Sequence, residues 1–110
     1  MEKLSERRCT ACTGSTPRIG GSELPAYLAE VAGFEIDAAQ TRIERRFEFR
    51  NFPETMMFVN GVAAIAHRED HHPDLEVGYN SCKVRFTTHA VGGLTENDFI
   101  AAAKVNALLA

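Results

Sequence analysis

Residues 67–98, HREDHHPDLEVGYNSCKVRFTTHAVGGLTEND, contain all the histidines of this 110-residue chain: His67, His71, His72 and His89. Imidazole has the unperturbed pKa nearest neutrality, so a cluster of imidazoles suits proton transfer or metal binding. The same residues carry the turn and strand patterns around which the fold is organised. We therefore work outward from this stretch.

Two short apolar alternations inside the stretch predict strands on either side of a tight turn at Asn80-Ser81. The alternating positions are Leu75, Val77 and Tyr79 in the first strand and Val84, Phe86 and Thr88 in the second. His89 should fall at the end of the second strand. Beyond it, Thr95 is expected to cap a final helix, with Asp98 as a variant of the capping box.

Upstream of the stretch, a helix is predicted from Pro53 to about Asp70, because Pro suits a first helical turn and Pro73 prevents continuation. Residues 43–50 alternate apolar and charged side chains, which predicts a half-buried strand with a solvated face of ion pairs. A brief strand is expected at 34–37. A first helix should be capped by Ser22 and stopped by Gly33.

The predicted order is α-β-β-α-β-β-α, an α+β fold with a four-stranded antiparallel sheet and three helices packed on one face. Patterning does not give the order of strands in the sheet. Residues 1–21 are expected to form an irregular, loosely ordered arm, and residues 22–110 a single domain.

Composition narrows the classes of function. A net charge of −3 and a pI near 5.8 argue against direct nucleic-acid binding, which needs clustered Lys and Arg. No apolar run could span a bilayer, and the N-terminal residues lack the apolar core of a signal peptide, so a cytoplasmic protein is expected. Cys9, Cys12 and Cys82 do not suggest a secreted disulfide framework.

The arm contains a C-x-x-C pair, Cys9 and Cys12. Such a pair can form half of a zinc site or a redox centre, but no second C-x-x-C completes a tetrahedral site and no strand precedes it. Reduced thiols in an irregular arm are the interpretation that we favour over a metal or redox role.

The spacing of the histidine stretch resembles the signature of the pterin-4a-carbinolamine dehydratase family. His71-His72-Pro73 is followed by Tyr79, His89 and Asp98 at the intervals of that signature. The likeness continues through residues 87–89, 93–95 and 43–49 and covers roughly residue 22 to the C-terminus. The chain departs from the usual family residues at three positions, which are Phe34, His67 and Leu75.

The resemblance implies the fold given above, often as a homodimer or homotetramer, and dehydration of a 4a-hydroxytetrahydropterin to a quinonoid dihydropterin without metal or organic cofactor. His71 and His89 would be acids serving hydroxyls on opposite faces of the ring, and His72 would orient the pterin and assist proton removal. The implied substrate-binding residues are Asp70, His71, His72, Thr87, Thr88, His89 and Ala90.

Asp98 has two interpretations: it supports the site through a histidine, or it only caps its own helix. We favour capping alone, because the local pattern is already complete. His67 is expected to be a solvated helix-surface residue.

Two other functions stay open. His67, His71 and His89 could ligate a metal ion, as in three-histidine zinc centres. The fold could also serve as a non-enzymatic dimerisation, assembly or transcriptional coactivator-type protein, as some members of the resembled family do. A pure scaffold, however, has no chemical need for the complete histidine set.

Overall fold

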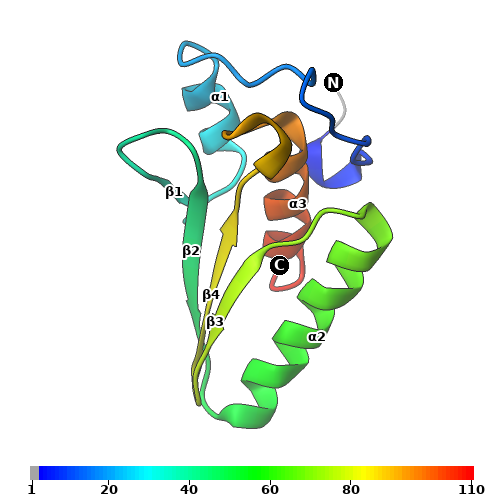
Figure 1. Cartoon of the computed structure of the whole chain (residues 1–110). Helices are drawn as coiled ribbons and strands as arrows, with labels where there is room; N and C mark the ends of the chain where they lie inside the picture. Colours follow the sequence, from blue (N-terminus) through cyan, green and yellow to red (C-terminus); the bar gives the residue numbers. More distant parts are fainter. Residues whose placement is uncertain (1–2) are drawn as a thin grey trace.

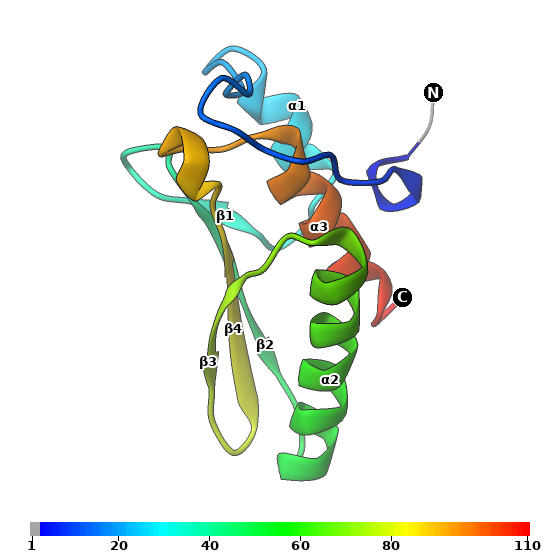
Figure 2. The same ribbon diagram turned by 45° about the vertical axis from the view of Figure 1, so that its right-hand side comes forward.

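The computed structural model describes residues 3–110, and the predicted order α-β-β-α-β-β-α is confirmed, with two added 3-10 turns. The elements are the turn Leu4–Glu6, α1 (Leu24–Ala29), β1 (Glu35–Ile36), β2 (Ile43–Glu48), α2 (Phe52–Glu69), β3 (Asp74–Val77), β4 (Ser81–Phe86), the turn His89–Val91 and α3 (Glu96–Ala107). The strands form one antiparallel sheet in the order β1-β2-β4-β3. The helices gather on one of its faces (Figures 1 and 2).

The two faces of the sheet differ as the alternation predicts. Ile43 and Phe47 of β2 and Val84 of β4 are buried beneath the helices. On the open face, Arg85 Nε lies 3.7 Å from Glu44 Oε1, and Lys83 Nζ lies 3.7 Å from Glu76 Oε2. The predicted solvated face of cross-strand ion pairs is therefore confirmed.

Helix α2 begins where its sequence predicts. The Asn51 side chain accepts a hydrogen bond from Glu54 N at 2.9 Å, and Pro53 lies in the first turn. Its inner face buries Phe58, Val62 and Ile65. No helix within residues 3–110 is long and apolar enough to cross a membrane.

Three predicted boundaries are wrong in detail. Helix α1 is capped by Glu23 rather than Ser22, without a side-chain capping bond. Tyr79 lies outside β3, because Gly78 N already bonds to Ser81 O at 2.8 Å and closes the hairpin turn. His89 is not the end of a strand but the first residue of a 3-10 turn.

The N-terminal arm is irregular apart from its 3-10 turn, but it is not loosely ordered. Leu4 is part of the hydrophobic core. Lys104 Nζ donates to Ser5 O at 2.8 Å, and Cys9 N donates to Glu69 Oε1 at 2.8 Å. In Figure 2 the arm (dark blue) passes close to the start of α3 and the end of α2, the two helices to which these bonds tie it.

Candidate active site

The predicted substrate-binding residues line one pocket of about 230 Å³. Its walls are Cys12, Asp70, His71, His72, Thr87, Thr88, His89 and Ala90. One group comes from the connection between α2 and β3, a second comes from the segment after β4, and Cys12 comes from the N-terminal arm. The three imidazoles expected to act together thus share one pocket; their roles stay predictions.

The end of α2 determines where the first two histidines lie. Asp70 is the C-cap of the helix and has φ 50° and ψ 43°, a left-handed conformation that Asp tolerates better than most residues. The next residue, His71, still bonds through its backbone N to Ala66 O at 3.2 Å. This reversal places His71 and His72 immediately before β3 instead of on a continued helix.

His89 lies in a short loop whose two ends, Thr88 and Gly93, are paired. Thr88 and Gly93 form an isolated antiparallel bridge, with Thr88 N donating to Gly93 O at 2.9 Å. Between them, the turn that starts at His89 ends at Gly92, whose φ of 62° favours glycine. The bridge holds the exposed His89 beside the end of β4.

Asp98 combines the two roles between which the sequence left a choice. Its Oδ2 accepts bonds from Thr95 N at 3.0 Å and from Thr88 Oγ1 at 2.8 Å, and the capping box at the start of α3 is complete. Its Oδ1 lies 2.7 Å from His71 Nε2. The carboxylate is fully buried, so the expectation of capping alone is incomplete.

The His71 ring is the most enclosed of the three imidazoles. Its side chain is 10% exposed, and the ring stacks on Phe86 at a centroid distance of 6.0 Å and an interplanar angle of 11°. His72 and His89 are exposed. His71 is therefore fixed from one edge by Asp98 and from one face by Phe86.

The side chains required for a three-histidine metal site do not converge. His67 is exposed on α2 and lies outside the pocket that His71 and His89 line. Within residues 3–110, no cluster of three or more His, Cys, Asp or Glu side chains is arranged to hold a metal ion.

Cys12 is a pocket residue that sequence reasoning missed. Asn97 Nδ2 donates to Cys12 Sγ at 3.1 Å and to Thr10 O at 2.6 Å, which anchors this part of the arm on the start of α3. The other thiol, Cys9, faces Asn97 O at 3.6 Å, and burial together with the charge of Glu69 raises its pKa to about 12. The C-x-x-C spacing marked the cysteines, but nothing local indicated where the arm docks.

Comparison with known proteins identifies relatives of this chain. The family model described as Pterin 4 alpha carbinolamine dehydratase matches residues 17–108. A protein of Nitrosomonas eutropha, provisionally named a pterin-4-alpha-carbinolamine dehydratase, is 50% identical over 96% of this chain and 93% of its own length. A protein of Stenotrophomonas maltophilia with the same provisional name is 49% identical over 96% of this chain and 90% of its own.

Solved structures show the same fold. A crystal structure described as a transcriptional coactivator/pterin dehydratase from Brucella melitensis matches with a TM-score of 0.81 and 32% identity over 86% of this chain and all of that chain. A pterin dehydratase-like protein described as a RuBisCO assembly factor has a TM-score of 0.62 at 21% identity, which shows the fold alone. From the family model and the close relatives, this chain belongs to the pterin 4 alpha carbinolamine dehydratase family, an enzyme family of hydro-lyases.

Proposed function

We propose that this protein dehydrates a 4a-hydroxytetrahydropterin to a quinonoid dihydropterin and water by histidine acid–base catalysis, and so recycles a pterin cofactor. In this reaction the C4a–O bond breaks, N5 loses its proton and a C4a=N5 double bond forms. The ring nitrogen supplies the electron pair. The protein needs only to deliver one proton to the departing hydroxyl and to accept one from N5.

The observation that carries the proposal is the 2.7 Å contact between His71 Nε2 and the buried carboxylate of Asp98. A carboxylate bonded to one ring nitrogen orients the imidazole and fixes which nitrogen carries the proton on that side. Among residues 3–110, Asp98 is the hydrogen-bond partner of the His71 ring, which leaves Nδ1 for a proton exchanged with substrate.

The remaining roles follow from the resemblance and from the shared pocket. His71 and His89 reach the pocket from two different segments of its wall, so they suit acids that serve hydroxyls on opposite faces of the pterin ring. His72, beside His71, would orient the ring and assist removal of the N5 proton. Asp70, Thr87, Thr88 and Ala90 would contribute further contacts, and Cys12 completes the wall.

The test is stopped-flow dehydration of a 4a-hydroxytetrahydropterin by metal-free wild-type protein, His71→Ala and His89→Ala. We expect wild type to accelerate the reaction and each substitution to slow it by about 10²-fold or more, the usual loss when a general acid is removed. His67→Ala is the matched control, because His67 is exposed and lies outside the pocket. An inert wild type, or full activity in both pocket variants, contradicts the proposal.

A second candidate function is a non-enzymatic interaction or coactivator-type role on the same fold. It is favoured by the description of the Brucella melitensis structure as a transcriptional coactivator as well as a pterin dehydratase. A biological role that is unaffected by His71→Ala would support this second function. We place the protein in the cytoplasm on either proposal.

A further inference from the structure

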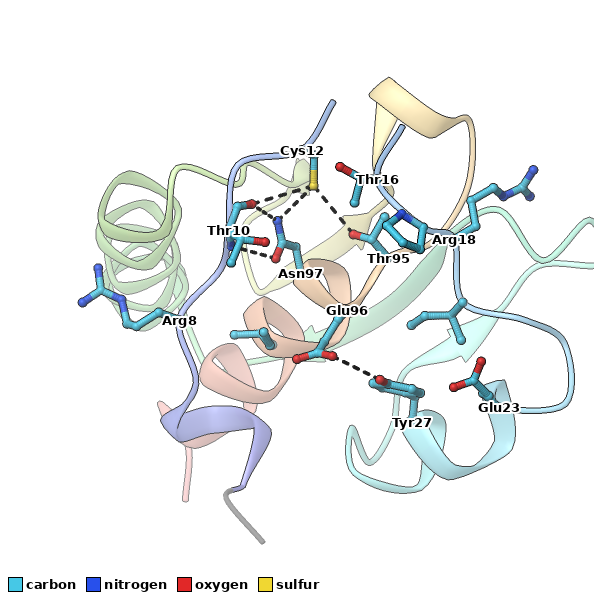
Figure 3. Close-up of a pocket in the computed structure, with 13 residues that line it drawn as sticks. Arg8, Thr10, Cys12, Thr16, Arg18, Glu23, Tyr27, Thr95, Glu96 and Asn97 are labelled. Carbon is cyan, nitrogen blue, oxygen red and sulfur yellow. Dashed lines mark hydrogen bonds between the residues drawn. The ribbon is translucent and has the colours of Figure 1, made fainter. Parts of the chain in front are cut away.

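A second and larger hollow adjoins the histidine pocket, and its volume is about 410 Å³. It lies between the arm, α1 and the start of α3 (Figure 3). Cys12 lines both hollows. Thr88 lines the histidine pocket and Thr95 lines the second hollow, and their side-chain hydroxyls are hydrogen-bonded at an Oγ1–Oγ1 distance of 2.9 Å. The two hollows are therefore neighbours, and Cys12 lies at the edge of both.

The second hollow combines apolar and hydrogen-bonding walls. Ile19, Tyr27 and Ile100 supply apolar surface, and Thr10 and Thr16 add hydroxyls. Charged side chains also line the hollow: Arg8, Arg18, Glu23 and Glu96. The carboxylate of Glu96 is already paired, because Arg7 Nη1 donates to it at 2.8 Å and Tyr27 Oη donates to it at 3.2 Å; Figure 3 draws the bond from Tyr27. Such walls match a ligand that has a flat or aliphatic body and polar or charged groups more closely than a small ion.

The sizes of the hollows indicate how they would be used together. The histidine pocket, at about 230 Å³, is smaller than the ~300–1,000 Å³ of most small-molecule sites. It suits a bicyclic pterin ring with little room to spare. A substituent on C6 of the ring must therefore extend out of the pocket. The second hollow, which begins at Cys12, is the neighbouring space that could bind it.

We propose that the second hollow binds the 6-substituent of the pterin, and that it selects pterins with an extended, aryl-containing substituent over those with a small alkyl group. This inference rests on the proposed dehydratase function. The arm would then be a substrate-specificity element, because it supplies Thr10, Cys12, Thr16 and Ile19 to the walls. The transferred atoms stay in the histidine pocket, so the second hollow acts on KM.

The test measures dehydration of carbinolamines from three tetrahydropterins, which carry a methyl, a dihydroxypropyl or an aminobenzoylglutamate group at C6. Thr10→Trp is the variant. Thr10 bonds to Asn97 through its backbone N and O alone, so replacing the side chain keeps these bonds, and the indole ring would fill the hollow. Ala11→Trp is the matched control, since Ala11 is exposed and lines neither hollow. Calorimetric Kd values of the unreactive 7,8-dihydropterins with the same substituents give a readout besides activity.

For wild type and Ala11→Trp, we expect KM and Kd to fall on the order of tenfold from the methyl to the aminobenzoyl compound. Thr10→Trp should erase this difference without changing the constants for the methyl compound. Equal constants for all three substituents in wild type would overturn the inference and leave the dehydratase proposal intact. If wild type accelerates none of the three reactions, both proposals fail.

Discussion

Both carboxylate oxygens of Asp98 are committed, one to His71 and the other to Thr88 and Thr95. A single residue therefore couples the stability of α3 to the position of the imidazole proposed as an acid. Bonds to a buried charge contribute about 1.5–3 kcal/mol each, and a donor left unpaired costs a similar amount. Substitution of Asp98 is thus expected to lower both the stability of the protein and its activity, and the two effects can be measured separately.

Asp98→Asn should lower the free energy of unfolding by about 1–3 kcal/mol and kcat by at least about tenfold, because the amide cannot hold the same three donors. Urea unfolding and stopped-flow dehydration measure the two effects. Asn51→Ala is the control: it removes the N-cap of α2 at a cost of about 1 kcal/mol, away from the pocket. Equal kcat in the two variants would contradict the positioning role.

At the scale of elements, Glu69 joins three segments of the chain. Its side chain is 1% exposed at the end of α2, where it accepts from Cys9 N and lies 3.1 Å from Arg8 Nε and 3.9 Å from Lys104 Nζ. Burial alone would raise its pKa, but the bond from Cys9 N and the charges of Lys104 and Arg8 lower it below the ordinary value. The arm is therefore docked by an ionised, buried carboxylate.

Glu69→Gln should destabilise the protein by about 1–3 kcal/mol at pH 7, since it removes a buried charge paired with cations. Because the pKa of Glu69 is lowered by folding, its stabilisation is present above the unfolded pKa of about 4.3 and is lost as pH falls through the folded value. Thermal unfolding of both proteins from pH 7 to pH 3 should show the difference shrinking with acid. A difference that is constant over this range would refute the ionised docking contact.

For the whole molecule, exposed apolar side chains favour self-association. Four of them lie on α2 or just after α3: Phe52, Met57, Leu108 and Leu109, with exposures of 47%, 74%, 42% and 53%. Phe49, Met57, Phe58 and Gly61 line a hollow of about 340 Å³ together with Leu108 and Leu109. A 12.1 kDa chain gains stability if such surface is covered.

We therefore expect a homodimer or homotetramer, and sedimentation equilibrium should give two or four times the chain mass. Met57→Glu should lower the mass, because a charge would be placed on the most exposed of these apolar side chains. Val77→Glu is a useful comparison, since Val77 is also exposed but lies on β3. A monomer in wild type at micromolar concentration would refute this expectation.

Local patterns carried most of the fold. The period of two in β2 and β4, the Thr95 cap and the proline in the first turn of α2 are readable because each depends on neighbours in the chain. The predicted boundaries at Ser22 and Tyr79 are wrong. Both are decided by backbone hydrogen bonds, in a short helix and in a tight turn, and side-chain patterns do not report such bonds.

By itself, the sequence determined the order of the elements and the buried face of the central strands, because these follow from periodicity along the chain. The residues expected around the histidines came from the resemblance to a known family, which rests on the spacing of the histidine stretch. Only the tertiary structure decided the strand order, the docking of the arm and the contact between His71 and Asp98, which are 27 residues apart. Those features depend on how distant segments pack. The periodicity of side chains along the sequence does not specify which polar atoms come into contact in the folded protein.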